Sequence, residues 1–202
     1  MVGRTIGHYR VLEQIGSGGM GVVYRVRDES LERDVVLKVL PAETLADPVA
    51  RARLLREARS AAALNHANIC TIHEVGEQGD QAFIAMELVD GQSLAELVGP
   101  KGMPPSMVLR YGIEIADALA HAHGRGSGRW GCCCTRWRGG ICRSPDRRRT
   151  RSRRAIMHAP PRALPESVPA GLRAVIARCL EKESAHRYAR AGEVRAALEA
   201  LQ

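Results

Sequence analysis

The 202-residue chain is poor in aromatic residues: they make up 3% of it, and Phe83 is its single phenylalanine. Its apolar runs are far shorter than the roughly 18 to 20 residues that a bilayer-spanning helix requires. The opening MVGRTIGHYR lacks the apolar stretch of a signal peptide. These absences argue against a membrane segment and predict a cytoplasmic location. With 45% hydrophobic residues, the chain can still bury one large core or two small ones.

Basic charge and cysteine are concentrated in one segment. Residues 125–154 contain 11 Arg, no Lys and one acidic residue, a net charge of +10, whereas the rest of the chain carries 19 basic and 21 acidic residues, a net charge of −2. Four of the six cysteines also lie there. The basic character therefore belongs to this segment. Of the two other cysteines, Cys179 falls on an apolar helical stripe, which predicts a core position.

From residue 8 to residue 90 the pattern is mostly that of β-strands. Short apolar runs separated by Gly-, Asp- and Glu-rich breaks predict a five-stranded antiparallel sheet. The five runs are YRVLEQI, GVVYRV, DVVLKVL, CTIHEVG and AFIAMELV. Between the third and fourth runs, DPVARARLLREARSAAALNH predicts a helix with Asp47 as its N-cap and Pro48 at its first position.

After Asp90 the hydrophobic period changes from 2 to 3.6. SLAELV predicts a short helix, and a stripe of small and apolar residues predicts a longer one over 106–123. Two more stripes, at 172–180 and 194–201, predict the closing helices. The expected organisation is a strand-rich lobe at residues 8–90, helices at 91–124 and 155–202, and the Cys- and Arg-rich segment at 125–154, for which we expect disorder.

A glycine-rich hairpin is the first sign of nucleotide chemistry. In IGSGGMGVVY, Gly16, Gly18 and Gly21 give Gly-x-Gly-x-x-Gly between two predicted strands. A dinucleotide-binding fingerprint would lead from a strand into a helix. A hairpin with this spacing can instead close over phosphates, because glycine lets backbone N–H groups approach them. Taken alone, the pattern also fits an ordinary turn.

Lys38, in the third strand, and Glu57, on the predicted helix, follow in order. An inward-facing lysine is costly unless it is paired, and a carboxylate on the helix would supply the pair. Such a pair can hold a cation against the phosphates of a nucleotide. For Lys38 alone, a solvated lysine on an edge strand is the alternative.

With these elements in order, residues 8–124 resemble the N-terminal lobe and first C-lobe helices of bacterial serine/threonine protein kinases. IGSGGMGVVY resembles the Gly-rich loop, VVLK the Val-Ala-Ile-Lys strand, Glu57 the glutamate of helix αC, and MELVDGQSL the gatekeeper and hinge. The closing stretch, with RCLEK and Arg187, is similar to the last helices of that family. The implied fold is α+β and protein-kinase-like: a five-stranded antiparallel N-lobe with one αC helix, plus an incomplete helical C-lobe.

The resemblance also implies an ATP site. Met86 would be the gatekeeper, and the backbone of Glu87 and Val89 would meet adenine. Val23 and Val36 would cover the purine, and Val36 stands where the family usually has alanine, which narrows the pocket slightly. The full implied set is Ile15, Gly16, Ser17, Gly18, Gly19, Met20, Gly21, Val22, Val23, Val36, Lys38, Glu57, Met86, Glu87 and Val89.

The catalytic motifs of the family are missing. Phosphoryl transfer needs an aspartate that positions the hydroxyl and ligands for the metal that bridges the β and γ phosphates. The family carries these on His-Arg-Asp-x-x-x-x-Asn and Asp-Phe-Gly, and neither motif occurs here. Ala-Pro-Glu is also absent, which removes the expected partner of Arg187. We therefore expect no catalytic residue, no ligands for the Mg²⁺ that the family uses, and weak ATP binding at most.

The first functional expectation is accordingly an inactive member of the serine/threonine kinase family. One alternative is a non-catalytic remnant that binds a nucleotide, or a protein partner through the N-lobe. The other is a degenerate gene product without a retained role. Nucleic acid is disfavoured as a partner, because a shifted reading frame fits the arginine-rich residues 125–154 better than a phosphate-binding tail does.

Three interpretations compete for residues 125–154. A zinc site would need pairs such as Cys-x-x-Cys, which three adjacent cysteines and Cys142 do not provide. An arginine-rich tail could bind nucleic-acid phosphates. We favour a shifted reading frame in a gene that has also lost its catalytic loop and activation segment. Cysteine codons are TGC or TGT, so the offset frame forces leucine at both junctions within Cys132–Cys134, where the family has helix αF.

Such a segment cannot replace αF, the central buried helix of the C-lobe, without burying unpaired arginines. We therefore expect the closing helices around Leu172 and Val194 to lack their main packing surface and to be loosely held, beside a folded N-lobe.

Sequencing the gene across codons 125–155 tests the frame-shift hypothesis. We expect an offset frame without stop codons that encodes an αF-like string, including the Pro-Phe turn that follows αF in the family. Stop codons in that frame, or a string unlike αF, would refute it.

Overall fold

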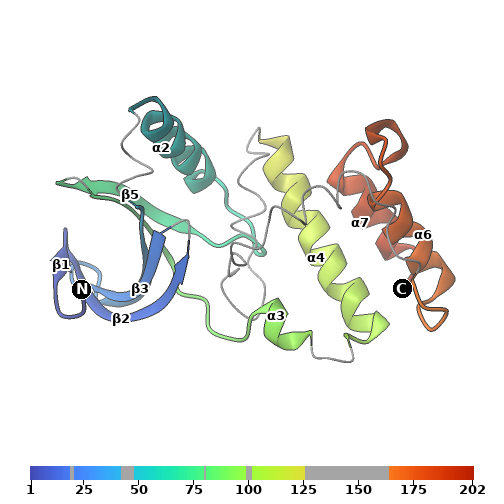
Figure 1. Ribbon diagram of the computed structural model, residues 1–202, viewed down its shortest axis with the longest axis horizontal. Helices are drawn as coiled ribbons and strands as arrows, with labels where there is room; N and C mark the ends of the chain where they lie inside the picture. The colour runs from blue at the N-terminus through green and yellow to red at the C-terminus, as the bar shows by residue number, and fades with distance from the viewer. Residues whose placement is uncertain (19–20, 42–47, 80, 99–101, 126–163) are drawn as a thin grey trace.

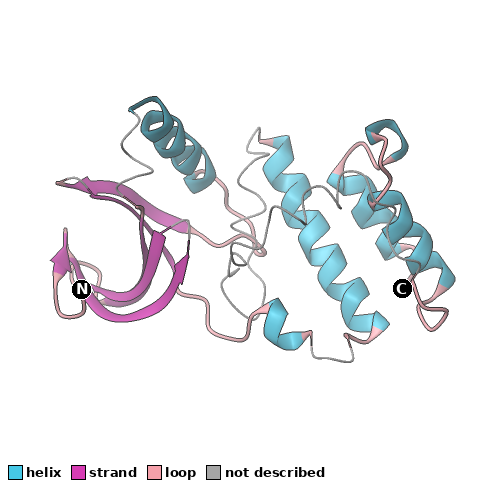
Figure 2. Ribbon diagram, in the orientation of Figure 1, coloured by secondary structure: helices cyan, strands magenta, loops and turns pink. Residues whose placement is uncertain are grey.

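The computed structural model describes residues 1–18, 21–41, 48–79, 81–98, 102–125 and 164–202. A strand-rich half and a helical half follow each other along the chain (Figures 1 and 2). The protein-kinase-like α+β fold expected from the sequence is confirmed. In the described part of the chain, no helix is long and apolar enough to cross a bilayer.

One antiparallel sheet of six strands forms the first half, in the order β1-β2-β3-β4-β6-β5. All five expected strands are present, and β1 is an addition of two residues that pairs with the start of β2. Two residues are too few to show a period, so the sequence pattern could not reveal β1. The strands are β1 (Thr5–Ile6), β2 (Tyr9–Gly18), β3 (Gly21–Asp28), β4 (Arg33–Val39), β5 (Ile72–Gln78) and β6 (Gln81–Glu87).

The two faces of the sheet have different roles. Successive side chains alternate between faces, and residues directly opposite each other on neighbouring strands share a face. Tyr24, Leu37 and Ala85 form one such row and belong to the larger apolar core. The neighbouring row, with Lys38 at its centre, lies on the other face. That core contains Ile6, Tyr9, Val11, Tyr24, Val26, Val35, Leu37, Val39, Phe83 and Ala85.

Helix α2 (Pro48–Ala62) packs on the Lys38 face of the sheet. Ala58 and Ala61, one turn apart, join a second core with Ile84 of β6. Pro48 is the first helical residue, as predicted, and Asp47 lies outside the described residues. The small alanines allow the helix to pack close to the sheet, and Glu57 is the residue before Ala58 on this helix.

The helical half begins with α3 (Leu94–Leu97), which has a capping box at Ser93 and Glu96. The long helix α4 (Pro105–Gly124) follows, and after the gap come α6 (Ala170–Cys179), the short 3₁₀ helix η1 (Ser184–His186) and α7 (Ala191–Glu199). The four helices predicted after Asp90 are therefore all present. Of the segment at 125–154, expected to be disordered, Arg125 caps the end of α4 and residues 126–154 lie outside the described residues.

The closing helices do have a packing surface, contrary to our expectation. Leu172, Val175 and Leu198 of α6 and α7 form a core with Val108 and Ile113 of α4. Helix α4 thus supplies the apolar packing surface that we expected from αF (Figure 1).

The predicted core position of Cys179 is wrong, because this residue is exposed. The next residue, Leu180, is also 48% exposed, so the apolar stripe of α6 continues beyond the part of the helix that α4 and α7 cover.

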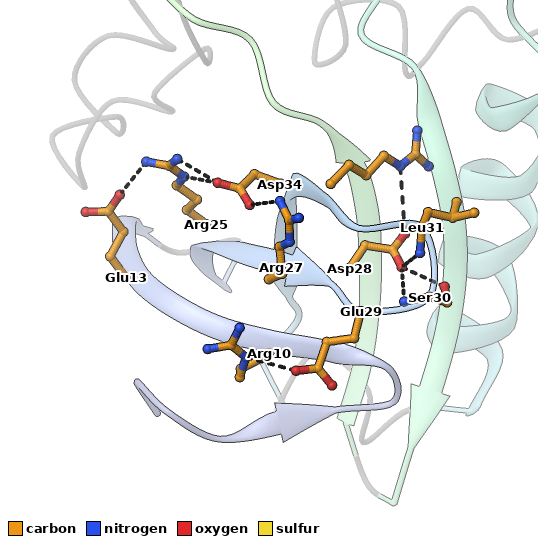
Figure 3. Close-up of polar contacts among 10 residues, drawn as sticks. Arg10, Glu13, Arg25, Arg27, Asp28, Glu29, Ser30, Leu31 and Asp34 are labelled. Carbon is orange, nitrogen blue, oxygen red and sulfur yellow. Dashed lines mark hydrogen bonds and ion pairs between the residues drawn. The ribbon is translucent and has the colours of Figure 1, made fainter.

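Asp28 organises the turn between β3 and β4 (Figure 3). Its Oδ1 accepts hydrogen bonds from the Ser30 hydroxyl at 2.7 Å and from the backbone N–H groups of Ser30 and Leu31 at 3.1 Å. The residue is 1% exposed. Burial raises the pKa of the Asp28 carboxyl, but these three hydrogen bonds outweigh it and hold the pKa below its usual value.

Replacing Asp28 by alanine should lower the free energy of unfolding by about 2 kcal/mol, because three hydrogen bonds to one carboxylate oxygen are lost. Ser30→Ala removes one hydrogen bond and should cost less. Since the pKa of Asp28 is depressed, its contribution is complete above about pH 4 and disappears as the pH falls through the lowered pKa. Urea titrations at pH 7 and pH 3 should therefore show the wild type and Asp28→Ala converging in acid. A constant difference would contradict this.

Candidate nucleotide-binding site

The predicted glycine-rich loop is the hairpin between β2 and β3. Gly16 lies opposite Val23, Ser17 opposite Val22, and Gly18 opposite Gly21. Ile15 precedes these pairs on β2. The tip of the hairpin, Gly19 and Met20, lies outside the described residues.

The three glycines of the motif meet different constraints. Gly21 has φ +112°, and a Cβ there would overlap the carbonyl oxygen of Val39, so the backbone itself requires glycine. A Cβ at Gly16 would reach only Val23 at 3.8 Å, and one at Gly18 would meet nothing within 4 Å. The fold therefore explains Gly21, whereas the open space at Gly16 and Gly18 leaves their backbone accessible to a ligand.

The register of the sheet brings Val23, Val36, Lys38 and Met86 onto one face. Lys38 lies between Val23 on β3 and Ile84 on β6, and Val36 lies opposite Met86. Val36 is completely buried, and Lys38 is half-buried. Lys38 is therefore central in the sheet, which rules out the edge-strand alternative.

Glu57 lies on α2, above the Lys38 face, but the two residues are not joined. None of the ion pairs between described residues links Lys38 to Glu57, and the Glu57 carboxylate lies 3.8 Å from Nε of Arg53 on the same helix. The side chain of Glu57 is 31% exposed. The structure therefore places both residues of the expected pair on the same side of the sheet without forming the pair.

The end of β6 is held by residues that sequence reasoning missed. The backbone N–H of Glu87 donates to the Thr71 carbonyl at 2.9 Å, and the Cys70 thiol lies 3.6 Å from the Glu87 carbonyl oxygen. Val89 follows β6 and is half-buried. Cys70 and Thr71 gave only a strand signal in the sequence, because no motif marks a contact that depends on how β5 enters the sheet.

An ion-pair group on the Lys38 face was also missed. Arg25, opposite Val36, contacts Glu13 at 3.4 Å and Asp34 at 2.6 Å, and Arg27 contacts Asp34 at 3.1 Å (Figure 3). The hydrogen bonds from Arg25 and then Arg27 hold the pKa of the Asp34 carboxyl below its usual value. The group ties β2, β3 and β4 together next to Val36.

The remaining predicted residues are outside this face. Arg187 donates to the carbonyl oxygens of Glu181 at 2.7 Å and Lys182 at 2.9 Å, so the backbone replaces the missing glutamate as its partner. Cys132–Cys134 and Cys142 lie outside the described residues. Across the residues that can be described, no group of three or more His, Cys, Asp and Glu side chains could hold a metal ion.

Known protein families and structures match the sequence over the whole candidate site. The sequence model described as Protein kinase domain matches residues 9–127. Serine/threonine-protein kinase PrkC of Bacillus subtilis is 39% identical over 61% of this chain and 19% of its own length. PknF of Mycobacterium tuberculosis is 42% identical over 61% of this chain and 26% of its own length. The chain thus spans about a fifth to a quarter of the length of these two relatives.

Solved structures extend the likeness to the closing helices. The crystal structure of the M. tuberculosis PknI kinase domain has a TM-score of 0.73 and 26% sequence identity, with 100% of this chain and 99% of that chain covered.

The contrast between the glycines can be tested by substitution. Gly21→Ala should lower the free energy of unfolding by at least about 2 kcal/mol, because its Cβ would displace the β4 backbone. Gly18→Ala, the matched control, should stay within about 0.5 kcal/mol of the wild type. Chemical denaturation measures both values. Equal decreases in the free energy of unfolding would contradict the difference between the two glycines.

Proposed function

The chain belongs to the protein kinase domain family, with bacterial serine/threonine kinases as its relatives, and from this membership we propose that it binds ATP without transferring phosphate. Binding takes place on the Lys38 face of the sheet. The glycine-rich hairpin covers the phosphates, Val23, Val36 and Met86 contact the purine, and the backbone of Glu87 and Val89 binds its edge. Residues 8–90 form the binding lobe, and residues 91–124 and 155–202 support it.

One observation carries the proposal: the strand register puts Val23, Val36, Lys38 and Met86 in adjacent rows of the same face. A half-buried lysine in the middle of a sheet is costly to keep without a partner. Because no ion pair with Glu57 balances it, an anionic ligand would supply the missing charge. Phosphates above Lys38 would meet the open backbone at Gly16 and Gly18.

The lack of transfer follows from the sequence. The kinase family uses ATP with Mg²⁺, and the metal and the accepting hydroxyl need aspartates that the His-Arg-Asp and Asp-Phe-Gly motifs would contribute. Neither motif occurs in this chain. ATP would then be held by the hairpin, Lys38 and the hinge alone, so we expect weak binding. The aspartates that bind Mg²⁺ in the family would be missing.

A second candidate is an interaction remnant that binds a protein partner through its N-lobe. It is favoured by the larger core, whose residues all lie between Ile6 and Ala85, so this half has a complete core of its own. A degenerate product without a role is the third candidate, and poor accumulation of the protein in its cell would distinguish it.

A thermal-shift titration tests ATP binding. At ATP concentrations about tenfold above Kd, the melting temperature should rise by about 3–6 °C. Lys38→Ala should abolish the rise, because the phosphates lose their cation. Lys182→Ala, between α6 and η1 and outside the candidate site, is the matched control and should keep it.

An assay with radiolabelled ATP and a generic protein substrate should detect no transfer. Transfer that Lys38→Ala removes would overturn the inactive assignment. The absence of any ATP-dependent shift would overturn nucleotide binding and favour the interaction remnant.

A further inference from the structure

A single carboxylate on α4 connects two segments that are distant in the chain. Asp117 Oδ2 lies 3.0 Å from Nε2 of His66, in the connection between α2 and β5. Its Oδ1 accepts a hydrogen bond from the guanidinium of Arg195 on α7. Each oxygen of Asp117 thus contacts a different element, one before and one after the undescribed residues 126–163.

The proton of His66 is fixed by its own loop. The backbone N–H of Asn68 donates to Nδ1 of His66 at 3.1 Å, so Nδ1 is an acceptor and the ring proton is on Nε2. That proton points to Asp117. The side chain of His66 is 15% exposed. The ring therefore acts as a rigid link between the backbone of the loop and the carboxylate on α4.

Further contacts hold the same loop against α4. The ring of His121 lies 5.0 Å from that of His66, and the Asn68 side chain donates to the Glu114 carbonyl at 3.4 Å. Ile69 packs in one core with Ala118 and other residues of α4. The loop cannot move far unless α4 moves with it.

The loop continues directly into the hinge contacts. Two residues after Asn68 comes Cys70, whose thiol lies near the Glu87 carbonyl, and then Thr71, whose carbonyl accepts the Glu87 N–H. A continuous path therefore runs from Arg195 through Asp117 and His66 to the backbone of Glu87. Helix α2, which carries Glu57, is attached to the other end of this loop.

We propose that Arg195 is a positioning residue for the nucleotide site: it orients Asp117, which fixes the loop at residues 66–71 and with it the hinge backbone at Glu87. This rests on the proposed function, since it assigns a role in ATP binding to a residue on the last helix, remote from the face that binds ATP.

The test uses Arg195→Gln with Glu199→Gln as its matched control. Arg195 Nε also contacts Glu199 at 3.3 Å, so the control removes the ion pair within α7 and leaves the contact with Asp117. Hydrogen exchange reports on residues 66–72, and calorimetric titration with ATP reports on the site. Arg195→Gln should reduce the amide protection of this loop about fivefold and ATP affinity about threefold. Glu199→Gln should change neither, and Arg195→Lys should restore part of both.

The two readouts separate the proposals. Unchanged loop protection in Arg195→Gln would overturn the positioning role, whatever happens to α7 itself. Equal effects in Glu199→Gln would overturn it too, because the loss would then come from a weaker α7. Wild-type protein that binds no ATP would refute the proposed function, and loop protection would still decide whether Arg195 fixes the loop.

Discussion

The pairing of β3 with β4 is the constraint on which the strand-rich half of the molecule depends. A slip of one residue would exchange the two faces of β4, so Lys38 would enter the core in place of the fully buried Leu37. Asp28 prevents this by closing the connection between the strands with three hydrogen bonds. Arg25 and Asp34 add an ion pair across the same two strands. Two carboxylates thus help to set which side chains of β4 lie on the Lys38 face.

The core and the site share strands, and the rows that contain Lys38 and Val36 lie on the face opposite the larger core. Every residue of the larger core lies between Ile6 and Ala85, and the candidate nucleotide residues alternate with them on β3, β4 and β6. The catalytic motifs of the family would come later in the chain, and none of this packing involves them. The geometry of the Lys38 face therefore does not depend on those motifs.

Most elements could be predicted from the sequence because each has a clear period or a glycine boundary. What failed depended on contacts between elements. The core position predicted for Cys179 was wrong, because the apolar stripe of α6 extends beyond the part of the helix that α4 and α7 cover. The contact of α4 with the second core could not be predicted, since Ala118 and Ala122, which make it, are too small to stand out in a hydrophobic pattern. The hydrogen bonds of Glu87 depend on the loop at residues 66–71, which has no motif.

The packing of α7 on α4 has a consequence in polymer terms. Bringing two chain segments together costs an entropy that grows with the logarithm of the number of residues between them, so each doubling of that number costs only about 0.6 kcal/mol. The apolar cluster that Leu198 shares with Val108 and Ile113 does not depend on that number. A gene can therefore gain or lose codons between α4 and α6 at little cost to the contacts on either side.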